Sequence, residues 1–259
     1  MITKELFEKY YLEERMSMKE IATMFGKHEG WARWWKGKFN IPTNPFYRSP
    51  YGKIHGEPIN PDAKYLILGS LLGDGSIVKV NSGAIFQAGH STKYLDFLLW
   101  KKECLNDLCH AKLVYYTNYA FEKRVDAARV YTISHPELLT LRNSWYPNGN
   151  KIITADNISD INDLSLSVFY MDDGSLSKRG RNVEISTNNF SEVENEVISD
   201  VIYNKFNIMS RVAKKYSKRM DKHYNYLFID KRNTDNLISV VRKYVSLVPS
   251  MLYKLPINS

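Results

Sequence analysis

The chain contains the stretch Tyr65-Leu-Ile-Leu-Gly-Ser-Leu-Leu-Gly-Asp-Gly-Ser-Ile77. A similar stretch occurs a second time as Leu164-Ser-Leu-Ser-Val-Phe-Tyr-Met-Asp-Asp-Gly-Ser-Leu176, and this repetition indicates the fold. Both copies are apolar runs of helical length that end in Asp-Gly. Their aspartates, Asp74 and Asp173, lie 99 positions apart. Repetition at a long, fixed period is typical of a duplicated structural unit.

The segments after the two copies also match in order. In the first half the pattern predicts strands at 76–80, 84–88, 112–117 and 129–134, and helices at 92–108 and 136–145. In the second half it predicts strands at 176–177, 183–187, 211–216 and 224–230, and helices at 191–206 and 234–245. We therefore expect two αββαββα halves, at 62–150 and 151–259.

The first 45 residues have a different, all-helical pattern. Ser17 and Glu20 have the spacing of a capping box at the start of a helix over 18–25. Gly26 supplies the positive φ of a tight turn before a further helix over 28–38, and Ala22 is small enough for the two helices to approach closely. We therefore expect a helix-turn-helix domain at 1–45. A proline-rich linker at 46–61 joins it to the repeat.

Composition narrows the class of partner. The chain of 259 residues has a formal net charge of +8, and such a balance favours an acidic partner, most often nucleic acid. The longest apolar run, 65–72, is far shorter than the roughly 20 residues of a membrane span. Cys104 and Cys109 exclude a disulfide scaffold, and no second Cys/His pair completes a zinc site with His110, so buried thiols are expected.

The repeat resembles the LAGLIDADG homing endonucleases, in the single-chain form that carries both motifs. The matching nonamers are Ile67-Leu-Gly-Ser-Leu-Leu-Gly-Asp-Gly75 and Leu166-Ser-Val-Phe-Tyr-Met-Asp-Asp-Gly174. The resemblance covers roughly 62–259 and implies an α+β fold whose two pseudo-symmetric halves form a DNA-binding saddle. It also implies a monomer that binds double-stranded DNA and hydrolyses both strands at a long asymmetric site, using Mg²⁺ or another divalent cation such as Mn²⁺.

The residues themselves indicate how such a site would form. Gly69 and Gly73 share one helix face, so a second helix can approach closely. If the two motif helices pack in parallel, Asp74 and Asp173 meet at their C-terminal ends, where repulsion and the helix dipoles both disfavour negative charge. A bound cation relieves this cost, and oxygen ligands with room for phosphate and water select Mg²⁺.

We therefore expect a metal site at the ends of the two motifs, with the ligands Asp74, Asp173, Gly73 and Asp172. The second motif departs from the family pattern because Val168 and Asp172 replace small residues. Its packing is consequently expected to be asymmetric, with Ser167 or Gly69 making the room.

The resemblance also implies accessory residues. Gln87 is expected near the catalytic water, and Lys231 is expected to assist charge stabilisation. The first-half counterpart of Lys231 falls near Ser134-His135, although a helix start before Pro136 is the better interpretation of His135.

DNA contacts are expected on the free face of the sheets and on the third N-terminal helix, because Arg, Lys, Gln and Asn suit phosphates and base edges. The expected sheet contacts are Lys79, His90, Lys112, Tyr115, Asn118, Lys178, Arg179, Arg181, Glu184, Ser186, Arg211, Lys214, Lys215, Lys218 and Arg219. The expected helical contacts are Lys27, His28, Glu29, Gly30, Arg33, Trp34 and Lys36, with Trp31, Ala32 and Trp35 packed inward.

The leading hypothesis is a metal-dependent DNA endonuclease, and one alternative is a non-catalytic relative. That alternative is a DNA-binding regulator or an RNA maturase; the retention of both aspartates argues against it, because nothing structural needs two juxtaposed carboxylates. An intein-embedded enzyme is a third possibility, but Met1 and the lack of a terminal His-Asn favour a free-standing gene product. The expected location is the cytoplasm of a bacterial or phage host cell, with an organellar matrix as the other option.

Overall fold

The structure is a computed structural model that describes residues 2–14, 16–42, 57–80, 83–108, 113–120, 123–179, 181–218 and 221–256. The chain divides into two compact units, Met1–Pro58 and Ile59–Ser259. Ile59 belongs to the second unit, because its side chain is buried and its backbone N–H donates to Glu137 at 2.8 Å. Most of the predicted linker lies outside the described residues. No helix in the described ranges has the length and apolarity needed to cross a membrane.

The first unit consists of α1 (Lys4–Glu8), the π-helical turn η1 (Lys9–Glu13), α2 (Met18–Met24) and α3 (Glu29–Lys38). The predicted capping box is present: the Glu20 N–H donates to Ser17 Oγ at 2.9 Å, and the Ser17 N–H donates to Glu20 Oε2 at 2.7 Å. Gly26 has a φ of +63° in the turn between α2 and α3. Ala22 is buried in the core of this unit, as predicted.

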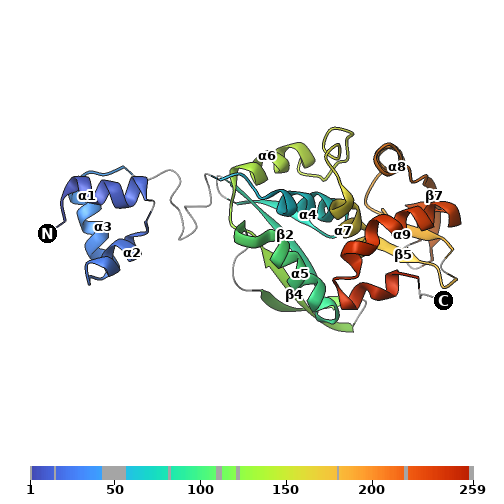
Figure 1. Cartoon of the computed structure of the whole chain (residues 1–259), viewed down its shortest axis with the longest axis horizontal. Coiled ribbons are helices and arrows are strands. Elements are labelled where there is room, and N and C mark those ends of the chain that lie inside the picture. Colours follow the sequence, from blue (N-terminus) through green and yellow to red (C-terminus); the bar gives the residue numbers. More distant parts are fainter. Residues whose placement is uncertain are drawn as a thin grey trace. The chain divides into compact units, whose positions relative to one another are not determined.

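The second unit contains two halves with the predicted element order (Figure 1). The first half has α4 (Pro61–Leu72), β1 (Ser76–Val80), β2 (Gly83–Ser91), η3 (Thr92–Tyr94), α5 (Leu95–Leu105), η4 (Asn106–Leu108), β3 (Val114–Ala120), β4 (Lys123–Tyr131) and α6 (Pro136–Trp145). The second half has α7 (Asp163–Asp173), β5 (Gly174–Leu176), β6 (Val183–Ser186), α8 (Glu192–Phe206), β7 (Arg211–Ser217), β8 (Lys222–Ile229), α9 (Lys231–Val245) and η5 (Pro249–Lys254).

Each half holds a four-stranded antiparallel sheet, and the two sheets have the same topology. The strand orders are β1-β2-β4-β3 and β5-β6-β8-β7. In β2, Ala84, Phe86 and Ala88 are buried on the face that α5 and α6 cover, so Gln87 and its alternate neighbours lie on the free face. Gln87 pairs with Tyr131 in the first sheet as Glu184 pairs with Phe228 in the second, so the two registers correspond.

The two motif helices, α4 and α7, pack against each other at the centre of this unit (Figure 1). A Cβ added at Gly69 would lie 2.3 Å from the backbone oxygen of Ser165, so only glycine allows this approach. Ser165 Oγ also donates to the Tyr65 carbonyl across the seam at 2.9 Å. The predicted role of Gly69 is confirmed. The serine at the contact is Ser165, because Ser167 bonds back to Asp163 of its own helix.

Candidate functional site

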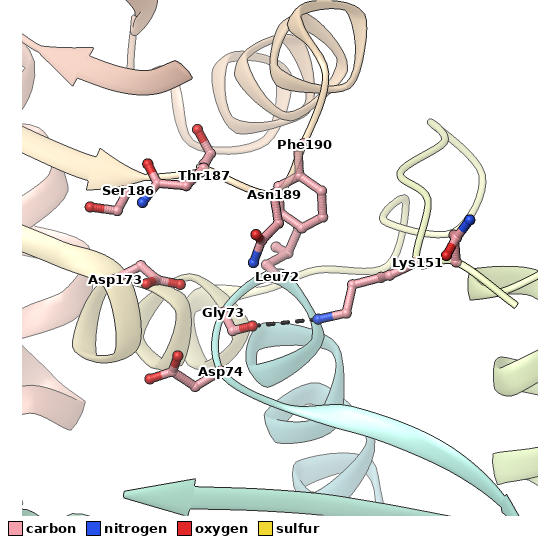
Figure 2. A pocket seen from close by; sticks show the side chains of 11 residues that line it. Leu72, Gly73, Asp74, Lys151, Asp173, Ser186, Thr187, Asn189 and Phe190 are labelled. Atoms are coloured by element: carbon pink, nitrogen blue, oxygen red, sulfur yellow. Dashed lines mark hydrogen bonds between the residues drawn. The ribbon is translucent and has the colours of Figure 1, made fainter. Parts of the chain in front are cut away.

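The ends of the two motif helices bring Asp74 and Asp173 to one cavity. Gly73 ends α4, and a Cβ at this position would lie 2.6 Å from Cβ of Asp172 on α7, so the helix ends are in contact. Both aspartates line a cavity of about 420 Å³ together with Lys151 and Thr187 (Figure 2). The two repeats, far apart in sequence, therefore form a single acidic site.

Burial and mutual repulsion perturb these carboxyl groups. Burial raises the pKa of Asp173 to about 7, and the charges of Asp74 and Asp172 add to the rise. Burial and Asp172 also raise the pKa of Asp74, against the opposing effect of His90 and Lys101. A site that holds several carboxylates at this cost is suited to a cation.

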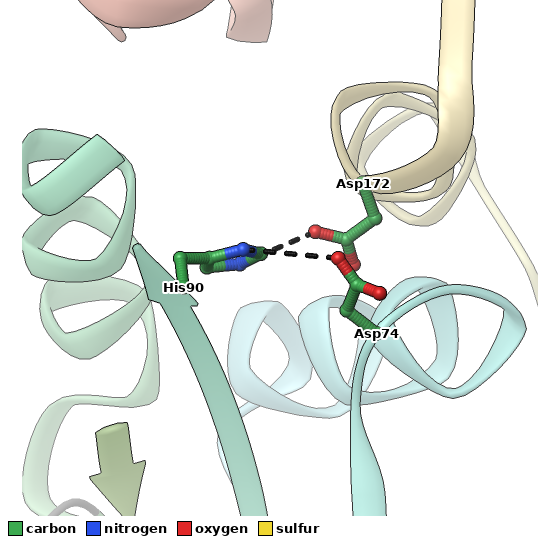
Figure 3. A group of neighbouring side chains, drawn as sticks. All are labelled: Asp74, His90 and Asp172. Carbon is green, nitrogen blue, oxygen red and sulfur yellow. Dashed lines mark ion pairs between the residues drawn. The ribbon is translucent and has the colours of Figure 1, made fainter. Parts of the chain in front are cut away.

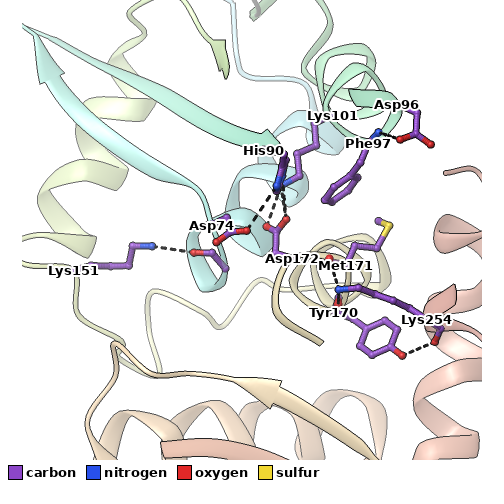
Figure 4. Close-up of polar contacts among 11 residues, drawn as sticks. Asp74, His90, Asp96, Phe97, Lys101, Lys151, Tyr170, Met171, Asp172 and Lys254 are labelled. Carbon is purple, nitrogen blue, oxygen red and sulfur yellow. Dashed lines mark hydrogen bonds and ion pairs between the residues drawn. The ribbon is translucent and has the colours of Figure 1, made fainter. Parts of the chain in front are cut away.

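Two lysines absent from the predicted site, the half-buried Lys151 and the buried Lys254, cap the motif helices (Figure 4). Lys151 Nζ donates to the carbonyls of Leu71 and Gly75 at 2.8 Å each, at the end of α4. Lys254 Nζ donates to the carbonyls of Tyr170 and Met171 at the end of α7. Each ammonium group thus sits where a helix dipole favours positive charge.

These lysines also offset the charge of the aspartates. Burial lowers the pKa of Lys151 and of Lys254 to about 8, while Asp74, Asp172 and Asp173 act in the opposite direction. The ammonium groups of the chain therefore offset part of the repulsion, while the pKa values of Asp74 and Asp173 stay raised. The repeat offered a signal for the two lysines, since each lysine follows the closing helix of its half.

A third lysine forms a buried ion pair with Asp172. Lys101 Nζ donates to both carboxylate oxygens, at 2.7 and 3.0 Å, and both side chains are fully buried. The backbone N–H of Asp74 is a further donor to Asp172. The extra bulk of Asp172 fits because Gly73 faces it. The Asp172 side chain, a predicted metal ligand, is thus engaged by Lys101.

His90 faces the carboxylates of both Asp74 and Asp172 (Figure 3). Its Nδ1 is 3.7 Å from Asp74 Oδ2, its Nε2 is 3.4 Å from Asp172 Oδ1, and its side chain is 8% exposed. Burial and the charge of Lys101 lower the pKa of His90 to about 3, so the imidazole is neutral. The prediction that His90 lies on the free face is wrong, because the alternation of β2 turns it toward the helices.

The residues at these helix ends fit a divalent cation. Asp74, His90 and Asp172 each offer a ligand atom, and these atoms lie within 4.8 Å of one another. His90 Nε2 is buried without a hydrogen-bonding partner in the described part of the chain. Carboxylate oxygen and imidazole nitrogen are both ordinary ligands of divalent metals.

The accessory residues proposed from sequence lie elsewhere. Gln87 Nε2 donates to Ser76 Oγ at 3.0 Å on the free face. Lys231 is exposed in the first turn of α9, whereas the ammonium groups whose charge lowers the pKa of Asp74 and Asp173 belong to Lys101 and Lys254. His135 caps α6 by accepting the Glu137 N–H at 3.2 Å, which confirms that it starts a helix.

The free face of the first sheet carries an arginine that the sequence analysis missed. Arg129 donates to the hydroxyls of Tyr116 and Tyr131 at 3.4 Å each and reaches Gln87 Oε1 at 3.5 Å. It crosses Gly89, where a Cβ would lie 3.3 Å from Arg129 Nε. These contacts hold the guanidinium in place on the free face.

Strand register corrects three of the predicted DNA contacts. Lys79 pairs with Ala84, whose side chain is buried on the helix-covered face, so Lys79 points to that side of the sheet. Tyr116 reaches Arg129 on the free face, so the adjacent Tyr115 points to the opposite side. Lys215 pairs with Glu184 on the free face at 3.3 Å, whereas Lys214 points to the helix side and pairs with Glu192 of α8 at 2.8 Å.

Other predicted contacts stay available to a partner. Arg211 lies over the Phe228 ring at 4.6 Å on the free face of the second sheet, and Ser186 lines the cavity. The exposed side chains include Lys178, Arg179, Arg181 and Lys218. Lys112 and Arg219, the side chain of Asn118, and Cys109 lie outside the described residues; Cys104 is half-buried rather than buried.

In the first unit, α3 has the predicted division of faces. Trp34 is 57% exposed beside Arg33 and Gly30, whereas Trp31 and Trp35 pack against the core that contains Ala32. Lys27 and His28 are exposed, Lys36 lies over the Tyr11 ring, and Glu29 accepts a hydrogen bond from Arg33 Nε at 3.0 Å.

Known proteins share this sequence pattern and fold. The model of the LAGLIDADG DNA endonuclease family matches residues 64–237. The chain is 27% identical over 208 residues to the cytochrome b mRNA maturase bI2 of Debaryomyces hansenii, covering 77% of this chain and 75% of that protein. It is 29% identical over 224 residues to the uncharacterized protein MJ1098 of Methanocaldococcus jannaschii, covering 83% of each.

A solved structure shows the same fold. The homing endonuclease I-WcaI, bound to its DNA recognition sequence, matches with a TM-score of 0.70 at 20% sequence identity, covering 86% of this chain and 98% of that chain. The family match, which spans both motif helices and both cavity-lining aspartates, extends over more than half of the chain. The chain therefore belongs to the LAGLIDADG DNA endonuclease family.

Proposed function

We propose that this protein is a monomeric, site-specific endonuclease that hydrolyses both strands of a long asymmetric DNA site. The observation that carries the proposal is the meeting of Asp74 and Asp173, one from each repeat, at a single cavity. Two acidic groups related by an internal repeat are suited to act on the two DNA strands, which run in opposite directions. The similarity to I-WcaI, which is described bound to DNA, supports a DNA substrate.

A divalent cation, Mg²⁺ or Mn²⁺, is the cofactor that we assign to the site, with Asp74 and Asp173 as its principal ligands. Such a cation, when bound, activates water and stabilises the leaving oxygen of a phosphodiester. The chain itself contributes Lys151, which lines the cavity and adds positive charge where a phosphate would enter, and the buried Lys254, whose charge acts on the same aspartates from the end of α7. The proposed roles of Gln87 and Lys231 are secondary to these groups.

The free faces of the two sheets are the proposed DNA surface, and they are chemically unlike. The first sheet presents Arg129 with Gln87, whereas the corresponding place of Gln87 in the second sheet holds Glu184, paired with Lys215. Unlike side chains at corresponding positions require unlike base pairs, which favours an asymmetric target.

The first unit is proposed to be a helix-turn-helix that makes a second DNA contact through the exposed side of α3. Its exposed Arg33 and Lys38, near the exposed Trp34, supply the charge for phosphate contacts. Removal of residues 1–50 should therefore lower DNA affinity and leave measurable cleavage. A truncated chain that folds but cannot cut at all would contradict this division of roles.

The main proposal is tested by cleavage of DNA that carries the genomic locus of this gene in the form that lacks the gene. Wild type should linearise a plasmid that carries the locus in Mg²⁺ or Mn²⁺ and not in EDTA. Asp74→Asn and Asp173→Asn should each abolish double-strand cleavage while binding persists, and Lys231→Ala measures the predicted accessory role. Tight binding without cleavage in every divalent metal would refute the endonuclease.

A second candidate is RNA maturation, favoured by the match to a cytochrome b mRNA maturase over 77% of this chain. A maturase should accelerate splicing of its own intron in vitro, and Asp74→Asn should not affect that rate. Accelerated splicing without DNA cleavage would favour this candidate.

A further inference from the structure

His90 is a buried histidine for which neither the fold nor a DNA contact gives a use. It is 8% exposed, its ring packs on Phe97 with centroids 4.9 Å apart, and both ring nitrogens face carboxylates. Its Nε2 lacks a hydrogen-bonding partner among the described residues. A buried imidazole that faces two carboxylates without a hydrogen bond from Nε2 is not explained by the fold, and its Nδ1 faces the cavity-lining Asp74 at 3.7 Å.

The two ring nitrogens of His90 differ in what they face. An imidazole that binds a metal through one ring nitrogen carries its proton on the other, so one of the two carboxylates, Asp74 or Asp172, faces the metal-binding lone pair and the other faces the N–H. Asp172 is fixed by two hydrogen bonds from Lys101, whereas the Asp74 side chain is half exposed and open to the cavity. The arrangement therefore favours Nε2–H toward Asp172 and the Nδ1 lone pair toward Asp74.

The separation of the two ligand atoms also fits a metal. Divalent metals hold nitrogen and oxygen ligands at about 2.1 Å, so two adjacent ligand atoms stand roughly 3 to 4 Å apart. Nδ1 of His90 and Oδ2 of Asp74 are 3.7 Å apart. A carboxylate that accepts from the second ring nitrogen is the usual support of a metal-bound histidine, and Asp172 Oδ1, 3.4 Å from Nε2, is placed to become that acceptor.

We propose that His90 is a nitrogen ligand of the divalent cation at Asp74, with Asp172, fixed by Lys101, orienting its ring. A nitrogen ligand shifts preference from Mg²⁺ toward Mn²⁺, Co²⁺ and Zn²⁺. In the second sheet the register places Thr187 at the position of His90, and this hydroxyl bonds Asn195. The Asp74 and Asp173 sides of the site are therefore unlike in metal preference.

The proposal rests on the proposed metal-dependent function but is tested without DNA or cleavage. Mn²⁺ is titrated into the full chain, and pulsed electron paramagnetic resonance detects ¹⁴N coupled to the bound ion. Wild type should show imidazole coupling, and so should His223→Gln, a matched exposed histidine. His90→Gln should remove the coupling and lower the Mn²⁺/Mg²⁺ affinity ratio by at least about tenfold.

Asp74→Asn provides a second variant that keeps the histidine, and it should remove the coupled ion. Bound Mn²⁺ without ¹⁴N coupling in wild type, coupling that survives in His90→Gln, or no Mn²⁺ binding at millimolar concentration would each overturn the proposal. Failure to cut DNA leaves these spectra unaffected and bears only on the endonuclease function.

Discussion

Replacement of Gly69 by alanine tests whether close contact of the motif helices holds the site together. The added Cβ would lie 2.3 Å from the backbone oxygen of Ser165 and 2.8 Å from its Cα, whereas ordinary contacts begin near 3.4 Å. The helices must therefore separate locally by about 1 Å, because backbone atoms cannot rotate away as a side chain can.

The magnitude follows from two opposing effects. Overpacking against a rigid backbone costs up to about 3 kcal/mol, and alanine regains about 1 kcal/mol of helix propensity over glycine. We expect Gly69→Ala to lower the free energy of unfolding by about 2 kcal/mol. Because Asp74 and Asp173 end these helices, a shift of about 1 Å should slow cleavage on the order of 100-fold.

Urea unfolding followed by circular dichroism, together with single-turnover cleavage, measures both effects. Gly37→Ala in α3 is the matched control, because nothing lies within 4 Å of its added Cβ. It should stabilise the first unit by about 1 kcal/mol. If Gly69→Ala is as stable as wild type and cuts at an unchanged rate, the helix contact does not set the geometry of the site.

Three further changes test other parts of the structure. Lys101→Met leaves Asp172 buried without its partner and should lower the free energy of unfolding, measured by thermal unfolding, by about 3–5 kcal/mol. The double variant Lys101→Met/Asp172→Asn should regain much of this stability, and a double variant that regains none would contradict the ion pair. Arg129→Ala should relax discrimination at one base pair by roughly 10- to 100-fold in a binding selection, whereas Lys178→Ala should weaken all sequences alike. The third change concerns Glu194. Burial acts to raise the pKa of this carboxyl group, but hydrogen bonds from the N–H groups of Ser191 and Ile153 lower it below its ordinary value. The Glu194 carboxylate therefore stabilises the fold fully above its pKa in the unfolded chain, and this stabilisation is lost as the pH falls through its pKa in the folded chain. Glu194→Gln should lower the free energy of unfolding by about 1 kcal/mol at neutral pH and should have no effect in acid. A destabilisation that does not depend on pH would refute this account.

The accessory residues of the site could not be placed from the sequence, because the sequence pattern does not state toward which face of a strand or helix each side chain points. Tyr115 and Tyr116 are chemically equivalent in sequence, and only the pairing of β3 with β4 decides which one reaches Arg129. Lys101 occupies an ordinary position in a helix, and nothing in a helical period marks it as the partner of Asp172. A shift of one residue in a strand moves a side chain to the opposite face.

The duplicated architecture, the capped helices of the first unit and the identity of the two aspartates could all be predicted from the amino-acid sequence. These features follow from local rules, because apolar periodicity, the Ser17–Glu20 cap and the small size of Gly69 act over a few residues or repeat at a fixed spacing. The surroundings of the aspartates, in contrast, depend on the packing of the folded chain. His90, Lys151 and Lys254 arrive from three separate segments, and their contacts with the helix ends exist only once both halves have packed.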